Sequence, residues 1–173
     1  MRIVVAIDPA VSAGEEANET GIIIAGLGED DHGYLLADRS GRWSPDGWAQ
    51  QAVHAYHSYR ADRIVGETNN GGDLIERVLR TVDPNVAYRS VHASRGKYLR
   101  AEPIAALYEQ RRIHHVGPFA ELEEQMCSFV PGVYKGSPDR LDAAVWAFTE
   151  LFLEPEVMEG YVFYDDRLQI SPI

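Results

Sequence analysis

The segment "SPDRLDAAVWAFTEL" (137–151) reads as a helix, yet it carries a carboxylate on the face that should meet the core. Its serine and proline suit a helix N-terminus, the serine as cap and the proline at the first helical position. Helical periodicity places Asp142 on the same face as Val145 and Trp146. Burying a carboxylate on that face is costly, and no simple structural role accounts for it, so Asp142 is a candidate ligand or catalytic residue. Asp139 is explained more simply by the positive end of the helix dipole.

Two further carboxylates stand at the ends of short apolar strands. Asp8 follows "RIVVAI" (2–7), and Glu67 ends "DRIVGE" (62–67). Ligands of open α/β sheets gather beyond the carboxyl ends of neighbouring parallel strands. If these two strands are neighbours, Asp8 and Glu67 project into one small space, and an inward-facing Asp142 delivers a third carboxylate to it.

Three close carboxylates repel one another and resist ionisation unless a cation lies among them. Hard divalent ions with oxygen ligands, Mg²⁺ or Mn²⁺, are the natural partners. Two such ions, bridged by carboxylates, activate water and stabilise the leaving oxygen in phosphodiester hydrolysis. The pattern therefore predicts that Asp8, Glu67 and Asp142 are both metal ligands and catalytic acids.

Two of these acids also have structural explanations. Asp8 precedes a proline and could close its strand and begin a turn. Glu67 could cap the glycine-rich loop "TNNGG" (68–72). The three acids carry more weight together than singly, because they stand where the inferred topology predicts convergence.

The elements that must position these acids follow an α/β order. The first three strands are close enough in sequence for an antiparallel meander, whereas the later strands need crossovers and so run parallel to a central strand. We expect a mixed five-stranded sheet flanked by helices. The expected strands are 2–7, 20–27, 33–39, 62–67 and 85–91, and the expected helices are 44–60, 71–82, 99–112, 121–129 and 138–151. His114 and His115, in the strand-like run 112–117, are expected to be structural.

The composition is that of a soluble globular protein. The 173 residues are 45% hydrophobic and 25% charged. No apolar run approaches the roughly 20 residues of a membrane helix, so we expect no membrane partner. Cys127, the single cysteine, excludes an internal disulfide and a multi-cysteine zinc site, and we expect it to be a small buried hydrophobe. An intracellular setting is the expectation.

The charge is unevenly distributed. The net charge of −11 argues against a protein that coats nucleic acid generally. Residues 77–112, however, form a basic band that holds only the acids Asp83, Glu102 and Glu109. Such a band fits a phosphate-bearing partner bound at a defined place, although basic residues also decorate solvated helix faces. Its members are Arg77, Arg80, Arg89, Arg95, Lys97, Arg100, Arg111 and Arg112.

The ordered set of motifs resembles the nuclease domain of the large terminase subunit of tailed bacteriophages. That domain has a ribonuclease H-like fold, shared with retroviral integrases and Holliday-junction resolvases. The likeness extends to about residue 153, which implies a nuclease domain at 1–153 and a C-terminal tail at 154–173 that packs on the domain or extends from it. The motifs are "VVAIDPA", "ETGIIIAG", "VGETNNGGDLI", "VHASRGKYLRAEPIAALYEQRRIHHVG", "ELEEQMCSFVP" and "SPDRLDAAVWAFTEL".

The resemblance implies a metal-dependent endonuclease that cuts concatemeric viral DNA with two divalent ions, Mg²⁺ or Mn²⁺. Matched by motif, Asp8, Glu67 and Asp142 are the metal-binding acids. Asp139 matches a position where some members carry an additional acid or a histidine near the metals. The implied partners are double-stranded DNA, a terminase ATPase domain, the small terminase subunit and the portal, and the implied location is the host cytoplasm.

The basic band then has an expected task. In "SRGKYLR" (94–100), Arg95, Lys97 and Arg100 follow the fifth strand and would lie beside the metal site. There they would contact DNA phosphates on either side of the scissile bond, which positions DNA without reading its sequence.

Terminases also carry an ATPase domain with a phosphate-cradling loop. The nearest segment here is "VHASRGKY" (91–98), where Val91 replaces the first glycine and Tyr98 the serine or threonine. That is no P-loop, so we expect no ATPase activity from this chain.

Three alternatives remain. A Holliday-junction resolvase would use the same two-metal chemistry. A non-catalytic DNA-binding or docking module could keep the fold, although intact acids at all three positions speak against it. A nucleotide-binding relative of sugar kinases and actin-like ATPases would need a tight glycine-rich turn after the first strand, and "DPAVSAGEEANE" (8–19) lacks one.

Overall fold

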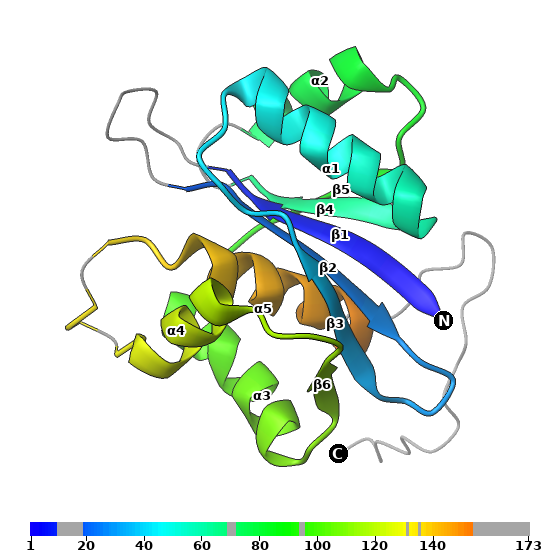
Figure 1. The fold of residues 1–173 in the computed structure, drawn as a ribbon. Coiled ribbons are helices and arrows are strands. Elements are labelled where there is room, and N and C mark those ends of the chain that lie inside the picture. Colours follow the sequence, from blue (N-terminus) through cyan, green and yellow to red (C-terminus); the bar gives the residue numbers. More distant parts are fainter. Residues whose placement is uncertain (10–18, 69–71, 94–95, 131, 135, 154–173) are drawn as a thin grey trace, which may run out of the picture.

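A six-stranded mixed sheet forms the centre of the molecule (Figure 1). The computed structural model describes residues 1–9, 19–68, 72–93, 96–130, 132–134 and 136–153. The strand order is β5-β4-β1-β2-β3-β6. The strands are β1 (Arg2–Asp8), β2 (Gly21–Leu27), β3 (Gly33–Asp38), β4 (Arg63–Glu67), β5 (Tyr88–Val91) and β6 (Ile113–His115).

The sheet combines both kinds of pairing that the sequence predicts. β1, β2 and β3 form an antiparallel meander, β4 lies parallel to β1, and β5 lies parallel to β4. The expected count of five strands is wrong, because β6 adds a sixth strand parallel to β3. This strand is only three residues long, which is too short for a reliable alternation of apolar and polar residues.

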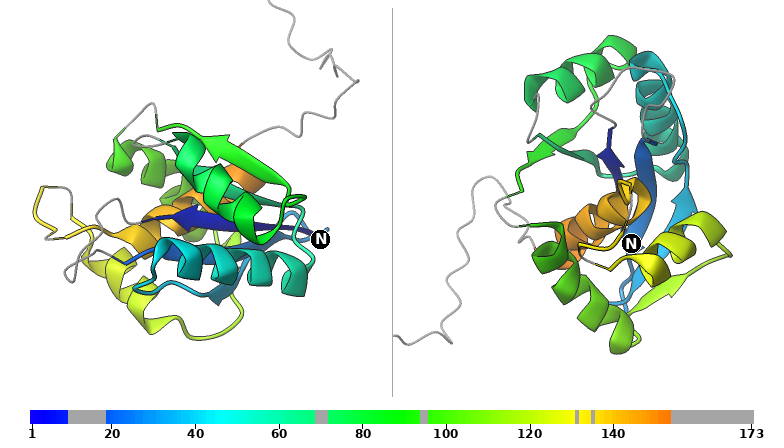
Figure 2. Two further views of the ribbon diagram at one scale, coloured as in Figure 1. Left: turned by 90° about the horizontal axis from the view of Figure 1, so that it is seen from above. Right: turned by 90° about the vertical axis from the view of Figure 1, so that its left-hand side faces the viewer.

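Helices cover both faces of the sheet, as the two views of Figure 2 show. α1 and α2 pack on one face, and α5 packs on the other with α3 and α4 beside it. The helices are α1 (Pro45–Tyr59), α2 (Gly72–Val82), α3 (Lys97–Glu109), α4 (Ala120–Ser128) and α5 (Asp139–Phe152). None of the described helices is long and apolar enough to cross a membrane.

β1 supplies both layers of the core because alternate side chains of a strand point to opposite faces. Val4 and Ala6 pack against the α5 side, whereas Val5 and Ile7 pack against the α1 side. The strand is therefore buried on both faces, as its unbroken apolar run predicts. Its last residue, Asp8, ends the apolar run of residues 3–7.

Local signals predict α1 more accurately than α5. Ser44 caps α1 by accepting a hydrogen bond from the Gly47 N–H, and Pro45 takes the first helical position. α5 begins one residue later than expected, at Asp139, so that Pro138 occupies the cap position and provides no side-chain acceptor. The start of α5 therefore depends on groups from elsewhere in the fold.

Cys127 corrects another expectation, because it is exposed rather than buried. α4 turns Leu122 fully into the core. A residue five positions further along lies about 140° round the helix from it, given about 100° per residue. Cys127 is therefore on the solvent side. The expected tail, 154–173, lies outside the described residues.

Candidate active site

Asp8 and Glu67 end neighbouring parallel strands at the same edge of the sheet. Ile7 of β1 is in register with Gly66 of β4, so the two acids follow the last paired residues side by side. The expected adjacency of these strands is confirmed. This edge is where β-strand carboxyl ends create the usual ligand crevice of an open α/β sheet.

The first turn of α5 brings two more acids to this edge. Asp139 is 5% exposed and Asp142 is 3% exposed, although both carry a carboxylate. Acidic residues are almost never buried this deeply unless they are paired. The inward position that helical periodicity predicts for Asp142 is therefore what the structure has.

Two basic side chains from the start of α3 enter the same cluster. The Lys97 ammonium pairs with the Asp142 carboxylate. Arg100 donates from Nη1 to Glu67 Oε2 at 2.8 Å, and its Nη2 lies 3.6 Å from Asp142 Oδ1. Arg95 lies outside the described residues. The expected phosphate contacts of Lys97 and Arg100 stay a prediction, and in this arrangement both side chains are bound to the acids.

Trp146 also contributes to the cluster, which the sequence did not reveal. Its indole Nε1 donates to Glu67 Oε2 at 2.8 Å, and its ring lies 4.6 Å below the Arg100 guanidinium carbon. The indole therefore orients both an acid and the cation that binds it. The sequence signal for this role is that Trp146 lies one turn after Asp142 on the same face of the helix. Helical periodicity alone, however, identifies Trp146 only as a core residue.

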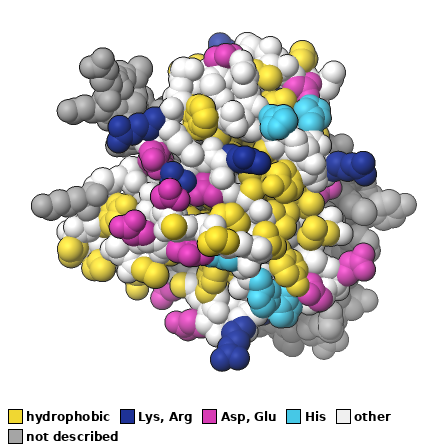
Figure 3. All heavy atoms as spheres, in the orientation of Figure 1, with side chains coloured by type: hydrophobic (Ala, Val, Ile, Leu, Met, Phe, Trp, Pro, Cys, Tyr) yellow, Lys and Arg dark blue, Asp and Glu magenta, His cyan; other side chains and the backbone are white. Residues whose placement is uncertain are grey.

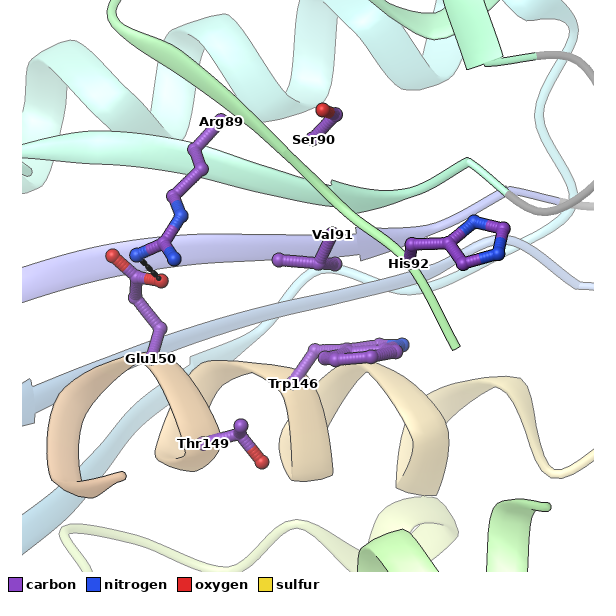
Figure 4. Close-up of a pocket in the computed structure, with 7 residues that line it drawn as sticks. All are labelled: Arg89, Ser90, Val91, His92, Trp146, Thr149 and Glu150. Carbon is purple, nitrogen blue, oxygen red and sulfur yellow. Dashed lines mark hydrogen bonds and ion pairs between the residues drawn. The ribbon is translucent and has the colours of Figure 1, made fainter. Parts of the chain in front are cut away.

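A small cavity of about 130 Å³ adjoins the cluster between β5 and α5. The close-up shows Arg89 paired with Glu150 at one end and the rings of His92 and Trp146 toward the other (Figure 4). Trp146 lines this cavity and also donates to Glu67 of the cluster. In the space-filling view, acidic and basic side chains gather side by side near the start of α5 (Figure 3).

Comparison with known proteins places this arrangement in a family. Residues 5–151 match the family model described as terminase RNaseH-like domain. The chain belongs to this family. The match runs from β1 to α5, so this terminase RNaseH-like domain includes Asp8, Glu67, Asp139 and Asp142. None of the curated proteins compared with the chain matches it significantly.

Solved structures show the same fold. The large terminase nuclease from thermophilic phage G20c, with bound cobalt, superposes with a TM-score of 0.65 at 14% identity, covering 86% of this chain and 81% of that one. The nuclease domain of the large terminase subunit gp2 of bacterial virus Sf6 gives 0.61 at 12%, with 85% and 87% covered. Thermus thermophilus RuvC gives 0.50 at 13%, with 87% and 93% covered.

Three acids of this terminase RNaseH-like domain have raised pKa values. Burial, reinforced by the Asp142 charge, raises the pKa of Asp8 to about 8. Burial also raises the pKa of Asp139 to about 6. The pKa of Asp142 is raised by burial even though Lys97 opposes the shift. Four carboxylates against two basic side chains leave the cluster short of positive charge.

The donor chemistry of this cluster fits a hard divalent cation. All the candidate ligand atoms are carboxylate oxygens, and within the described residues no hydrogen-bond donor contacts the carboxylate of Asp8. No three described acid, histidine or cysteine side chains lie close enough together to hold an ion as they stand. Lys97 and Arg100 instead hold two of the acids, so ion binding requires these ion pairs to open.

The histidines of β6 make structural contacts, as expected. His114 Nε2 lies 2.7 Å from His32 Nδ1, and the two rings stack. His115 lies 2.8 Å from a Glu123 carboxylate oxygen and 2.9 Å from the Tyr108 hydroxyl. β6 forms the far edge of the sheet from β4, away from the acids.

The indole of Trp146 provides a first prediction. Trp146→Phe keeps an aromatic ring but removes the N–H that orients Glu67, so the apparent affinity for Mn²⁺ should fall about tenfold. Calorimetric Mn²⁺ titration measures it. Trp43→Phe, at a Trp that is 41% exposed and whose Nε1 donates to a backbone carbonyl, is the matched control and should bind Mn²⁺ like the unmodified protein. Equal affinities in the two variants would contradict a role for the indole.

Proposed function

We propose that the chain is a divalent-metal-dependent DNA endonuclease of a viral genome-packaging terminase, which cuts concatemeric double-stranded DNA in the host cytoplasm. One observation carries this proposal. Half-buried carboxylates at the ends of β1 and β4 and buried carboxylates from α5 converge at one edge of the sheet in a chain of the terminase RNaseH-like family. Four acids close together destabilise the fold because their charges repel one another. A bound cation would relieve this repulsion, so such a cluster is typical of a cation-binding site.

Asp8, Glu67 and Asp142 would hold two Mg²⁺ or Mn²⁺ ions, with Asp139 as an additional ligand. Bound there, the ions would activate water and stabilise negative charge on the leaving oxygen. Trp146 keeps the Glu67 carboxylate pointed at the site. Before an ion binds, Lys97 and Arg100 offset part of the negative charge by pairing with Asp142 and Glu67. Once released, the Lys97 ammonium lies where it can bind a DNA phosphate.

The relatives support the choice of ligand and partners. The Sf6 domain was crystallised with manganese, and the G20c nuclease with cobalt and with zinc. We extend divalent-ion dependence from them to this chain. Membership of the terminase family supports an ATPase domain, the small terminase subunit and the portal as further partners.

A Holliday-junction resolvase is the second candidate. The fold of the yeast mitochondrial resolvase Ydc2 superposes with a TM-score of 0.51 at 13% identity, covering 83% of this chain and 76% of that one. The two activities differ in substrate. A terminase nuclease cuts plain duplex DNA, whereas a resolvase requires a four-way junction.

Plasmid cleavage tests the proposed function. Supercoiled plasmid incubated with the protein and Mn²⁺ or Mg²⁺ should become nicked and then linear, and chelator should stop the reaction. Undiminished cutting in chelator would exclude the metal-dependent mechanism. Cleavage of a synthetic four-way junction, with plain duplex left intact, would favour the resolvase. Binding without any cleavage would favour the non-catalytic module.

The proposed phosphate contact of Lys97 gives a second prediction. Lys97→Ala should weaken binding to unrelated duplexes by a similar factor and reduce the slope of log affinity against log salt by about 1. The Lys97 side chain is 43% exposed and so accessible to DNA. Arg80→Ala, which removes one positive charge from α2 on the opposite face of the sheet, is the control and should leave the slope unchanged. Equal slopes in both variants would make Lys97 only a counterion of the acids.

A further inference from the structure

The start of α5 receives its cap from another helix. The first N–H groups of a helix have no partner within it, and Pro138 at the cap position supplies no side-chain acceptor. Gln125 of α4 fills this place. Its Oε1 accepts hydrogen bonds from the backbone N–H of Arg140 at 3.1 Å and of Leu141 at 3.2 Å.

The same turn is tied to the sheet by Arg140. Arg140 is only 9% exposed. Its Nη1 donates to Asp38 Oδ2 at 2.7 Å, and its Nε donates to Glu19 Oε2 at 3.0 Å. Two ion pairs thus join the first turn of α5 to the end of β3 and to the segment before β2.

The backbone of β2 contacts the first turn of α5 from a third side. A Cβ on Gly21 would lie 2.0 Å from the Asp139 carbonyl oxygen, so only glycine permits α5 to approach this closely. Gly21 is the residue directly opposite Asp8 in the β1–β2 pair. The contact therefore places the turn that carries Asp139 and Asp142 immediately beside Asp8.

We propose that Gln125 is a positioning residue of the nuclease site, which holds the first turn of α5 so that Asp142 and Asp139 face Asp8. The inference rests on the proposed function. Lys97 and Arg100 bind the acids themselves and must release them for a cation. Gln125 binds only the backbone of the turn, so its hold persists when those ion pairs open. Ligands must be held to within about half an ångström of the productive geometry by such supporting contacts.

Paired substitutions at Gln125 test this role. Gln125→Met keeps the length of the side chain but removes the acceptor, and it should weaken the apparent Mn²⁺ affinity about tenfold. Gln125→Glu keeps an acceptor oxygen and adds a charge that a helix N-terminus favours, so it should bind Mn²⁺ within about twofold of the unmodified protein. The probe is Mn²⁺ alone, measured by calorimetry and by the rise in melting temperature.

Two further readouts separate positioning from general stability. In metal-free protein, the amides of Arg140 and Leu141 should exchange with solvent faster in Gln125→Met than in Gln125→Glu. In plasmid cleavage, kcat should fall about tenfold in Gln125→Met while KM for DNA stays unchanged, which is the pattern of a lost interaction that acts in the transition state. Gln50→Met, at an exposed glutamine of α1, is the matched control and should change none of these quantities.

The outcomes are distinct. Unchanged Mn²⁺ affinity in Gln125→Met overturns the positioning role while leaving the proposed function intact. Equal losses in Gln125→Met and Gln125→Glu overturn the capping explanation. An unmodified protein that Mn²⁺ fails to stabilise overturns the proposed function itself. If Gln125→Met does not fold, Gln125→Asn, which withdraws the amide by one methylene, replaces it with the same expected loss.

Discussion

Asp142→Asn is expected to reduce DNA cleavage by at least about a hundredfold, since it removes a charge that organises transition-state stabilisation. The metal-free protein should be as stable as the unmodified one or slightly more stable. The raised pKa of Asp142 means that its charge costs more in the folded protein than in the unfolded chain, and asparagine removes that charge. Mn²⁺ should raise the melting temperature of the unmodified protein through binding to the folded state alone, and should raise that of the variant less.

Thermal melts with and without Mn²⁺, run beside plasmid cleavage, measure these effects. Asp46→Asn is the matched control, because Asp46 is an acid in the first turn of α1, as Asp142 is in the first turn of α5, but is exposed. It should keep full activity and the full Mn²⁺ stabilisation. A purely structural Asp142 predicts the reverse for Asp142→Asn, namely lowered stability and intact cleavage, and a stable, fully active variant would end its assignment to the site.

The second large effect is a loss of metal-free stability as the pH rises. Burial and neighbouring acids disfavour the charge of Asp8, so its pKa rises from the ordinary 3.8 to about 8 in the folded protein. Between these values the folded state binds more protons than the unfolded state, so the free energy of unfolding falls with rising pH. The stability contributed by Asp8 is complete below pH 3.8 and is lost as the pH passes through about 8. Asp139, with a pKa of about 6, adds a loss of the same sign.

Melting temperatures from pH 5 to pH 9 in chelator measure this effect. We expect a decline of about 5 °C or more, since about 1 kcal/mol corresponds to about 2–4 °C in a domain of this size. Exposed acids with lowered pKa values, such as Asp30 and Glu123, make the free energy of unfolding rise with pH instead. That rise takes place below pH 5, outside the measured range. Asp8→Asn should flatten the decline. A flat profile for the unmodified protein would show that Asp8 is not strained by its neighbours.

The positions of the candidate acids could be predicted because each depends on a local pattern and one topological rule. Asp8 and Glu67 end apolar strands, and parallel pairing of those strands follows from the order of elements. Asp142 is placed by helical periodicity. These inferences need no knowledge of which side chains meet across the fold.

The contacts that orient the acids could not be predicted in this way. Trp146 meets Glu67 across 79 positions of sequence, and Gln125 meets the start of α5 across 15 and 16. No periodicity relates such pairs, since their meeting depends on how whole elements pack. The same limit explains why the ion pair between Lys97 and Asp142 could not be predicted.

The most direct measurement is an anomalous-difference map from a crystal of this protein grown with Mn²⁺. We expect two peaks among the carboxylates of Asp8, Glu67 and Asp142, each about 2.0–2.3 Å from their oxygens. We also expect Lys97 to have left Asp142. A map without peaks at this edge of the sheet, at a Mn²⁺ concentration that supports cleavage and with the ion pairs of Lys97 and Arg100 intact, would contradict the account.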